Sequence, residues 1–153
     1  MDRFLTMFQN PFLNVALLSW FIAQVIKTIL HMMLTGKLSI ERLFGDGGMP
    51  SGHSATVSSL AMLSGMVYGM DSFQFAVTAV LAIIVCHDAM GVRLETGKQA
   101  KLINEIQKAV EIITKKELPE VKLKEFVGHT PSQVWAGVTI GLLNGILFYY
   151  LFF

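Results

Sequence analysis

Residues 12–34 read FLNVALLSWFIAQVIKTILHMML, and Lys27 is their only charged side chain. A helix that crosses the hydrocarbon core of a bilayer needs about 20 consecutive, mostly apolar residues. The run is longer than the core of a signal peptide, and it lacks a small-residue cleavage site. The sequence therefore predicts that this segment is the first membrane-spanning helix.

Three further apolar stretches follow, at residues 54–70, 73–90 and 133–152. Only Asp71-Ser72 separates the first two, which predicts a tight helical hairpin. The chain of 153 residues is 53% hydrophobic and has a mean hydropathy of +0.56, which excludes an ordinary soluble domain of this size. We expect an all-α integral membrane bundle of about four transmembrane helices, forming a single domain over residues 1–153.

The segment 91–130 is too polar to span a membrane. Within it, Lys98–Lys116 has helical periodicity, with Glu and Lys on one face and apolar residues on the other. The apolar residues are Ile103, Ile106, Val110 and Ile113. This pattern predicts an amphipathic helix on the cytoplasmic side that lies along the bilayer surface or caps the bundle.

The basic residues predict an orientation. The formal net charge of +1 gives no support to nucleic-acid binding. With four spans, segments 35–53 and 91–130 share one side of the membrane, and together they hold ten of the twelve Lys and Arg residues. The positive-inside rule therefore predicts a multi-pass protein of the cell membrane with both long segments in the cytoplasm and both termini outside.

Residues 47–54 read GGMPSGHS and lie where a polar loop becomes a spanning helix. Glycines let the backbone approach an anion, and the first N–H groups of a helix point at it with the positive end of the dipole. Ser51 and Ser54 can cap the helix or donate to phosphate oxygens. His53 is placed to give a proton to a leaving oxygen. The plainer interpretation is a Pro-Ser helix start with an incidental histidine.

A second histidine, His129, stands at the entry to the last span and, by topology, on the same membrane face as His53. A lone interfacial histidine is more often a polar anchor. The hypothesis that one histidine is a nucleophile and the other an acid therefore rests on the presence of two histidines at the same membrane face. Lys27 lies about 10 Å inside its span at 1.5 Å per residue. An ionisable group there is a functional candidate, or it snorkels toward the headgroups. The single cysteine, Cys86, is expected to be inert.

Two segments carry a family resemblance: PSGHS at 50–54 and GHTPSQVWAG at 128–137. They resemble the type-2 phosphatidic acid phosphatase superfamily, which includes the vanadium-dependent haloperoxidases. The closer similarity is to its divergent branch of small bacterial and plant membrane proteins. That similarity extends to AQVIK at 23–27 and to DAMGVR at 88–93, followed by GKQA at 97–100.

The resemblance implies hydrolysis of a lipid or isoprenoid phosphate monoester in two steps. His129 would attack phosphorus to form a phosphohistidine, and His53 would protonate the leaving alkoxide. Water would then release phosphate, with no metal or other cofactor required. The groups that would hold the phosphoryl oxygens are Lys27, Ser51, Gly52 and Arg93.

The chain departs from the wider superfamily around His129. Gln133 stands where a carboxylate is usual, so Asp88 or Glu125 could supply the acid, and Asp88 could instead pair with Lys27 or Arg93. Leu123 stands where an arginine is expected. These departures leave open a catalytically inactive protein that binds phosphate lipids or assists membrane assembly. A transporter subunit ranks last, because four short spans are few for a transport pathway.

Small residues recur at four-residue spacing in the predicted spans, a pattern that lets helices pack closely. They are Gly65 and Gly69 in the hairpin, and Gly137, Gly141 and Gly145 in the last span. They serve packing within the bundle or a homodimer, and the sequence leaves that choice open.

Overall fold

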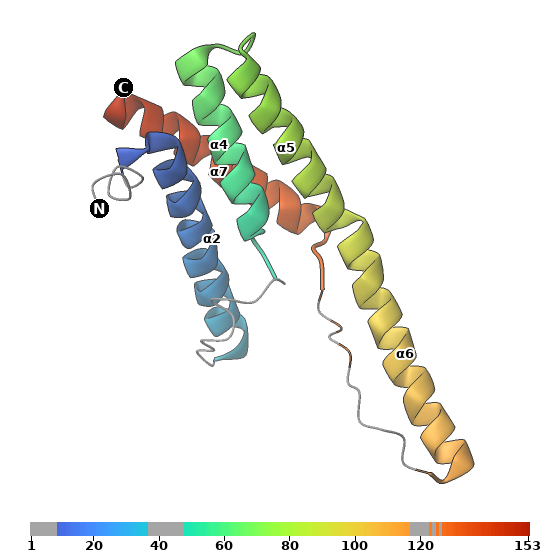
Figure 1. The fold of residues 1–153 in the computed structure, drawn as a ribbon. Coiled ribbons are helices and arrows are strands. Elements are labelled where there is room, and N and C mark those ends of the chain that lie inside the picture. Colours follow the sequence, from blue (N-terminus) through green and yellow to red (C-terminus); the bar gives the residue numbers. More distant parts are fainter. Residues whose placement is uncertain (1–8, 37–47, 117–122, 124, 126) are drawn as a thin grey trace, which may run out of the picture.

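The computed structural model describes residues 9–36, 48–116, 123, 125 and 127–153. Within them the chain forms helices and no strand, so the all-α prediction is confirmed (Figure 1). The helices are α2 (Pro11–Thr35), α4 (Gly52–Tyr68), α5 (Phe73–Met90), α6 (Val92–Thr114) and α7 (Pro131–Phe152). Four of the ten basic residues in segments 35–53 and 91–130, namely Lys37, Arg42, Lys122 and Lys124, lie outside the described part, as does Gly47 of the GGMPSGHS loop.

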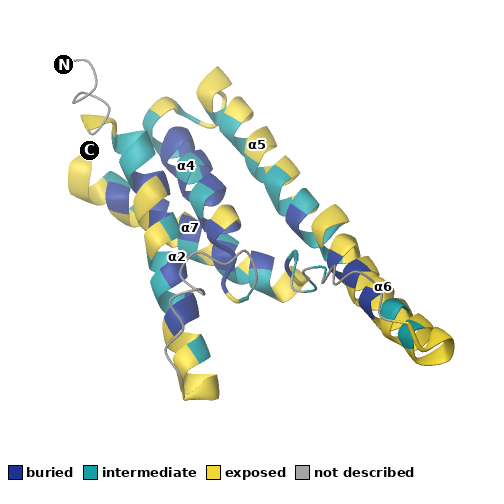
Figure 2. Ribbon diagram, turned by 60° about the horizontal axis from the view of Figure 1, so that its bottom comes forward, coloured by how far each residue is buried: buried dark blue, intermediate teal, exposed yellow. Residues whose placement is uncertain are grey.

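Helix α4 is the centre of the bundle, and α2, α5 and α7 all pack against it. Among the described residues, α2 and α5 flank α4 without contacting each other (Figure 1). Figure 2 shows buried positions concentrated on α4, whereas the outer faces of the other helices are exposed. Large apolar side chains such as Phe73 and Ile83 are 79% and 68% exposed on α5, which suits a surface that faces lipid.

Glycines on α7 let its backbone approach that of α4. A Cβ atom added at Gly137 would lie 2.3 Å from the Ser51 carbonyl oxygen, and one at Gly141 would lie 2.4 Å from the Ala55 carbonyl oxygen. No side chain fits at such distances. The four-residue glycine spacing of the last span therefore serves packing within the bundle.

In the part of the chain that the structure describes, three helical stretches are long and apolar enough to cross a membrane: Pro11–Thr35, Phe73–Thr114 and Pro131–Phe152. Helix α4 has 17 residues, and most of them are buried. At the end of the bundle that contains both the start of α2 and the end of α7, Phe12 stacks on Tyr68 with ring centroids 5.2 Å apart. The ring of Phe12 also lies near that of Phe153, with ring centroids 6.4 Å apart.

Helix α6 continues α5 and extends beyond the bundle (Figure 1). Gly91 interrupts the helix, but helical hydrogen bonds continue on both sides of it. The Gly91 N–H donates to the His87 carbonyl (2.9 Å), and the Glu95 N–H donates to the Gly91 carbonyl (3.1 Å). The chain consequently does not turn at Gly91. The predicted amphipathic helix is present. It does not cap the bundle, which was one of the two positions expected for it.

The chain returns from α6 along the same helix. The side-chain amide of Asn104 donates to the Leu123 carbonyl (3.0 Å) and to the Glu125 carboxylate (2.8 Å), and its oxygen accepts from the Leu123 N–H (3.1 Å). Glu125, considered above as the acid beside His129, thus bonds to Asn104. Gly97 faces the returning backbone, where a Cβ would lie 2.7 Å from the carbonyl oxygens of Glu125 and Val127. The described residues Leu123, Glu125 and Val127 therefore lie beside α6.

Candidate active site

The turn that begins α4 is built around Ser51. Its Oγ accepts hydrogen bonds from the Ser54 N–H (3.3 Å) and the Ser54 hydroxyl (2.9 Å), and both serines are fully buried. The Ser51 N–H donates to the Gln133 carbonyl at 3.0 Å, which ties this turn to the first turn of α7. Of the two roles expected for these hydroxyls, the structure shows the helix cap.

Gly52 is the first residue of α4 and packs on α2. A Cβ added to it would lie 3.2 Å from Cδ1 of Trp20. Its N–H and that of His53 belong to the first helical turn, which has no carbonyl partners within the helix. Gly52 thus serves helix packing through its missing side chain, while the positive end of α4 stays next to His53.

Gly128 fixes where His129 lies. Its φ is +83°, and a Cβ there would be 2.3 Å from the Leu94 nitrogen and 2.5 Å from the Arg93 carbonyl carbon. The His129 N–H also donates to the Ala89 carbonyl at 3.0 Å. These contacts seat His129 against the junction of α5 and α6, where it is 3% exposed.

The imidazole of His129 is oriented by the backbone. Its Nδ1 lies 3.1 Å from the Gly128 carbonyl oxygen. A carbonyl oxygen can only accept, so Nδ1 carries the proton and Nε2 keeps its lone pair. The side-chain oxygen of Gln133, which stands where a carboxylate is usual, accepts from the Thr130 N–H at 3.1 Å in the capping box of α7. No sequence signal pointed to the role of the Gly128 carbonyl, although a glycine directly before a histidine allows such close backbone geometry.

The two histidines line one cavity of about 230 Å³ between α4, α5 and the turn before α7. Its lining residues are His53, Ile84, Val85, Asp88, Ala89, Arg93, Gly128 and His129. Four of the residues predicted from sequence are thereby brought together from three separate segments. The apolar wall from Ile84 and Val85 was not anticipated, because an apolar residue in a span carries no sign of the cavity it faces.

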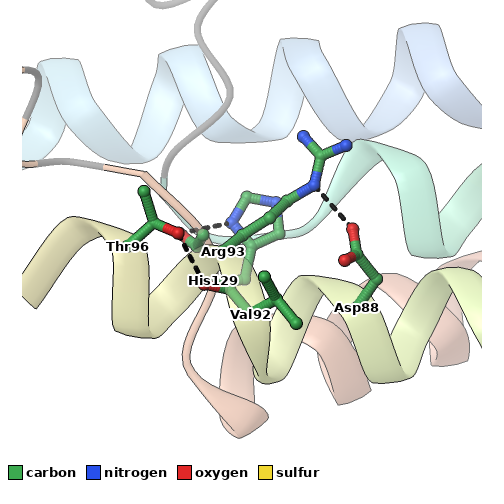
Figure 3. Close-up of polar contacts among 6 residues, drawn as sticks. Asp88, Val92, Arg93, Thr96 and His129 are labelled. Carbon is green, nitrogen blue, oxygen red and sulfur yellow. Dashed lines mark hydrogen bonds and ion pairs between the residues drawn. The ribbon is translucent and has the colours of Figure 1, made fainter.

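Arg93 and Asp88 form an ion pair at this cavity, with Nε 2.7 Å from Oδ2 (Figure 3). The side chains are 52% and 44% exposed, so the pair itself contributes little to stability. Asp88 engages the guanidinium through Nε, and both residues line the cavity. Of the partners considered for Asp88, the structure shows Arg93.

Lys27 lies in a different cavity. It is 4% exposed, so it does not snorkel to the surface, and its aliphatic stem packs on Gly48. It lines a space of about 390 Å³ with Leu30, His31, Leu34, Gly48, Met49 and Gln133. This second cavity shares no lining residue with the one that holds the histidines.

Nearby on α2, Gln24 is 5% exposed, and its Oε1 has no hydrogen-bond partner among the described residues. Across the described part of the chain, no three His, Cys, Asp or Glu side chains gather as metal ligands would. The chemistry available at the histidine cavity is therefore that of imidazoles, one guanidinium and a carboxylate.

Comparison with known proteins can now be set beside this geometry. The family model described as the divergent PAP2 family matches residues 8–144. The chain belongs to this family. A relative from Bacillus subtilis (strain 168), named "Uncharacterized membrane protein YuiD", is 37% identical over 139 residues, which cover 85% of this chain and 88% of the relative. No solved structure matches the chain significantly. The resemblance drawn from the loop segments is confirmed, and the chain is a membrane protein of the divergent PAP2 family.

The backbone contact of His129 predicts its tautomer. In protein labelled with ¹⁵N-histidine, at a pH where the ring is neutral, we expect the proton on Nδ1 and the lone pair on Nε2. Long-range ¹H–¹⁵N correlation spectra would show this, with the signal assigned by its loss in His129→Ala and with exposed His87 as a reference. A ring that carries its proton on Nε2 would contradict the orientation described here.

Proposed function

We propose that this protein is a phosphoric monoester hydrolase that cleaves a lipid or isoprenoid phosphate through a phosphohistidine intermediate. The observation that carries the proposal is the shared cavity of His53 and His129, which are remote in the chain. Arg93 lines the same cavity and supplies the positive charge that a phosphoryl group needs.

In the first step, the Nε2 lone pair of His129 attacks phosphorus, and the bond from phosphorus to the ester oxygen breaks. The proton on His53 passes to that oxygen, so the product leaves as an alcohol. Arg93 balances the charge on the phosphoryl oxygens, and Asp88 holds the guanidinium by its Nε. The carbonyl of Gly128 keeps the attacking ring in the required tautomer.

In the second step, a water molecule attacks the phosphohistidine. His53, now neutral, takes a proton from that water, and the bond between phosphorus and Nε2 breaks. Phosphate leaves with His129 restored. The two histidines are used in turn, and no residue outside the cavity is needed to move a proton.

A lipid substrate is supported by the position of the cavity, which lies where α4, α5 and α7 end or begin and thus at headgroup depth. The distribution of lysine and arginine supports a cytoplasmic site, with both termini outside the cell membrane.

The second candidate function is a catalytically inactive binder of phosphate lipids or a membrane assembly protein. The separate cavity of Lys27 and the use of Gln133 in a helix cap favour it, because they reduce the groups around the phosphate. Radiolabelled substrate would leave acid-labile label on the protein only if the proposed enzyme is correct.

Replacing His129 by alanine is expected to abolish phosphate release from lipid phosphates by the protein purified in detergent. His53→Ala should lower kcat by about 10²- to 10⁴-fold, as for loss of a general acid. His87→Ala is the matched control, because His87 is exposed at the end of α5 and does not line the cavity. Wild-type protein as inactive as His129→Ala over a broad substrate panel would refute the enzymatic function.

Replacing Arg93 by alanine removes charge-assisted hydrogen bonds of about 1.5–3 kcal/mol. We therefore expect kcat/KM to fall by about 10- to 100-fold. The control is Lys98→Ala, which removes another cation, paired at 2.7 Å with Glu95 on exposed α6. An equal loss in both variants would mean that Arg93 acts only as one more positive charge on this side.

The proposed orientation predicts which loops a membrane-impermeant maleimide reaches in intact cells. With Cys86→Ser as background, Asp71→Cys in the hairpin should be labelled from outside, and Glu105→Cys on α6 only after permeabilisation. Both positions are exposed, so burial does not bias the comparison. The reverse pattern would place the histidine cavity on the outer face.

A further inference from the structure

An apolar groove runs along α4 next to the histidine cavity. Its volume is about 420 Å³, and it is lined by Leu17, Trp20, His53, Thr56, Val57 and Val85. Helix α4 forms the floor, α2 contributes Leu17 and Trp20 as one wall, and α5 contributes Val85 as the other. The groove is open on one side, and in the described part α2 and α5 flank α4 without close backbone contact with each other (Figure 1).

The groove adjoins the histidine cavity, because His53 and Val85 line both. The proposed reaction decides which part of the substrate would lie in each space. The acid that protonates the leaving oxygen must touch the oxygen that joins phosphorus to the rest of the substrate. With phosphorus at His129 and that oxygen at His53, the organic part of the substrate starts at the mouth of the groove.

Beyond His53, the side chains that line the groove offer mostly hydrocarbon surface and few polar groups. Thr56 and Val57 are the floor residues next after His53, and the Thr56 hydroxyl is already bonded to the Gly52 carbonyl at 2.8 Å. The indole of Trp20, which lines the groove, lies against Gly52. A leaving group with polar atoms next to the ester oxygen would lose hydrogen bonds to water here without replacement.

On the basis of the proposed function, we propose that the groove binds the hydrocarbon chain of the substrate and that the substrate is the phosphate monoester of a long-chain alcohol. The chain begins directly at the ester oxygen, lies on Thr56 and Val57, and reaches the bilayer between α2 and α5. Straight alkyl and prenyl chains share this chemistry. A glycerol-based phosphate places ester groups where the groove is apolar and is the poorer substrate.

The test uses water-soluble alkyl monophosphates from ethyl to octyl, below their micelle-forming concentrations, so that each methylene is transferred from water. In the wild type, kcat/KM should rise by up to about fourfold for each methylene that enters the groove. Thr56→Phe fills the floor and should lower this rise to below about twofold per methylene.

The matched control is Thr78→Phe. Thr78 likewise bonds its hydroxyl to a backbone carbonyl, that of Gln74 at 2.9 Å, and it lines a separate apolar recess near the hairpin turn. Its chain-length dependence should equal that of the wild type. Partition of substrate into detergent affects both variants alike, so only filling of the groove separates them.

A second pair of variants covers the case in which Thr56→Phe does not fold. Leu17→Ala shortens an exposed wall residue of the groove, and Leu18→Ala makes the same change at its neighbour, which lines only a recess between α2 and α7. The ratio of kcat/KM for octyl over ethyl phosphate should fall in Leu17→Ala and stay unchanged in Leu18→Ala.

The outcomes separate this inference from the proposed function. Phosphate release with an unchanged chain-length dependence in both groove variants would overturn the inference alone. A higher kcat/KM for dioctanoyl phosphatidate than for octyl phosphate would also overturn it. No release from any substrate would refute the function, and the inference with it. If the expected result is obtained, kcat/KM for prenyl and alkyl phosphates of equal carbon number would show which kind of chain the groove prefers.

Discussion

Close contact between backbones, at positions where only a hydrogen atom fits as a side chain, sets the arrangement of this protein. Gly137 and Gly141 bring α7 against the first turns of α4, and Gly128 lies on the backbone of Arg93 and Leu94. In a bilayer, helices gain little from burying apolar side chains against each other, so close packing and hydrogen bonds hold them together. Both histidine-bearing turns are positioned by contacts of this kind.

The two turns are also joined by hydrogen bonds to neighbouring elements. The Ser51 N–H reaches the Gln133 carbonyl, and the His129 N–H reaches the Ala89 carbonyl. The starts of α4 and α7 and the end of α5 are thereby fixed to one another. A site built in this way depends on rigid helix ends, which suits a reaction in which two imidazoles must act on opposite sides of one phosphorus atom.

The distance in sequence between Arg93 and His129 has a structural explanation. Helix α6 starts beside Arg93, and Asn104 on it bonds to Leu123 and Glu125. Gly128 then lies on the backbone of Arg93 and Leu94. Arg93 and His129 consequently line one cavity although they are far apart in the chain.

The sequence by itself determined the all-α membrane class, the approximate ranges of the helices and the family. It also singled out His53 and His129, the two histidines that line one cavity. These follow from the length of apolar runs and from local motifs, which depend on neighbouring residues alone. It also singled out Lys27 as a phosphate ligand, and the structure buries that residue at the lining of a second cavity.

Only the tertiary structure decided which groups meet, because that depends on contacts between segments far apart in the chain. The role of the Gly128 carbonyl, the Asp88–Arg93 pair, the cap formed by Gln133 and the groove beside His53 belong to this class. Periodicity shows which face of a helix is apolar, but in a membrane both lipid and protein neighbours favour apolar faces. The pattern cannot tell a lipid-facing valine from one that lines a binding site, and only the packing of α2, α4 and α5 does so.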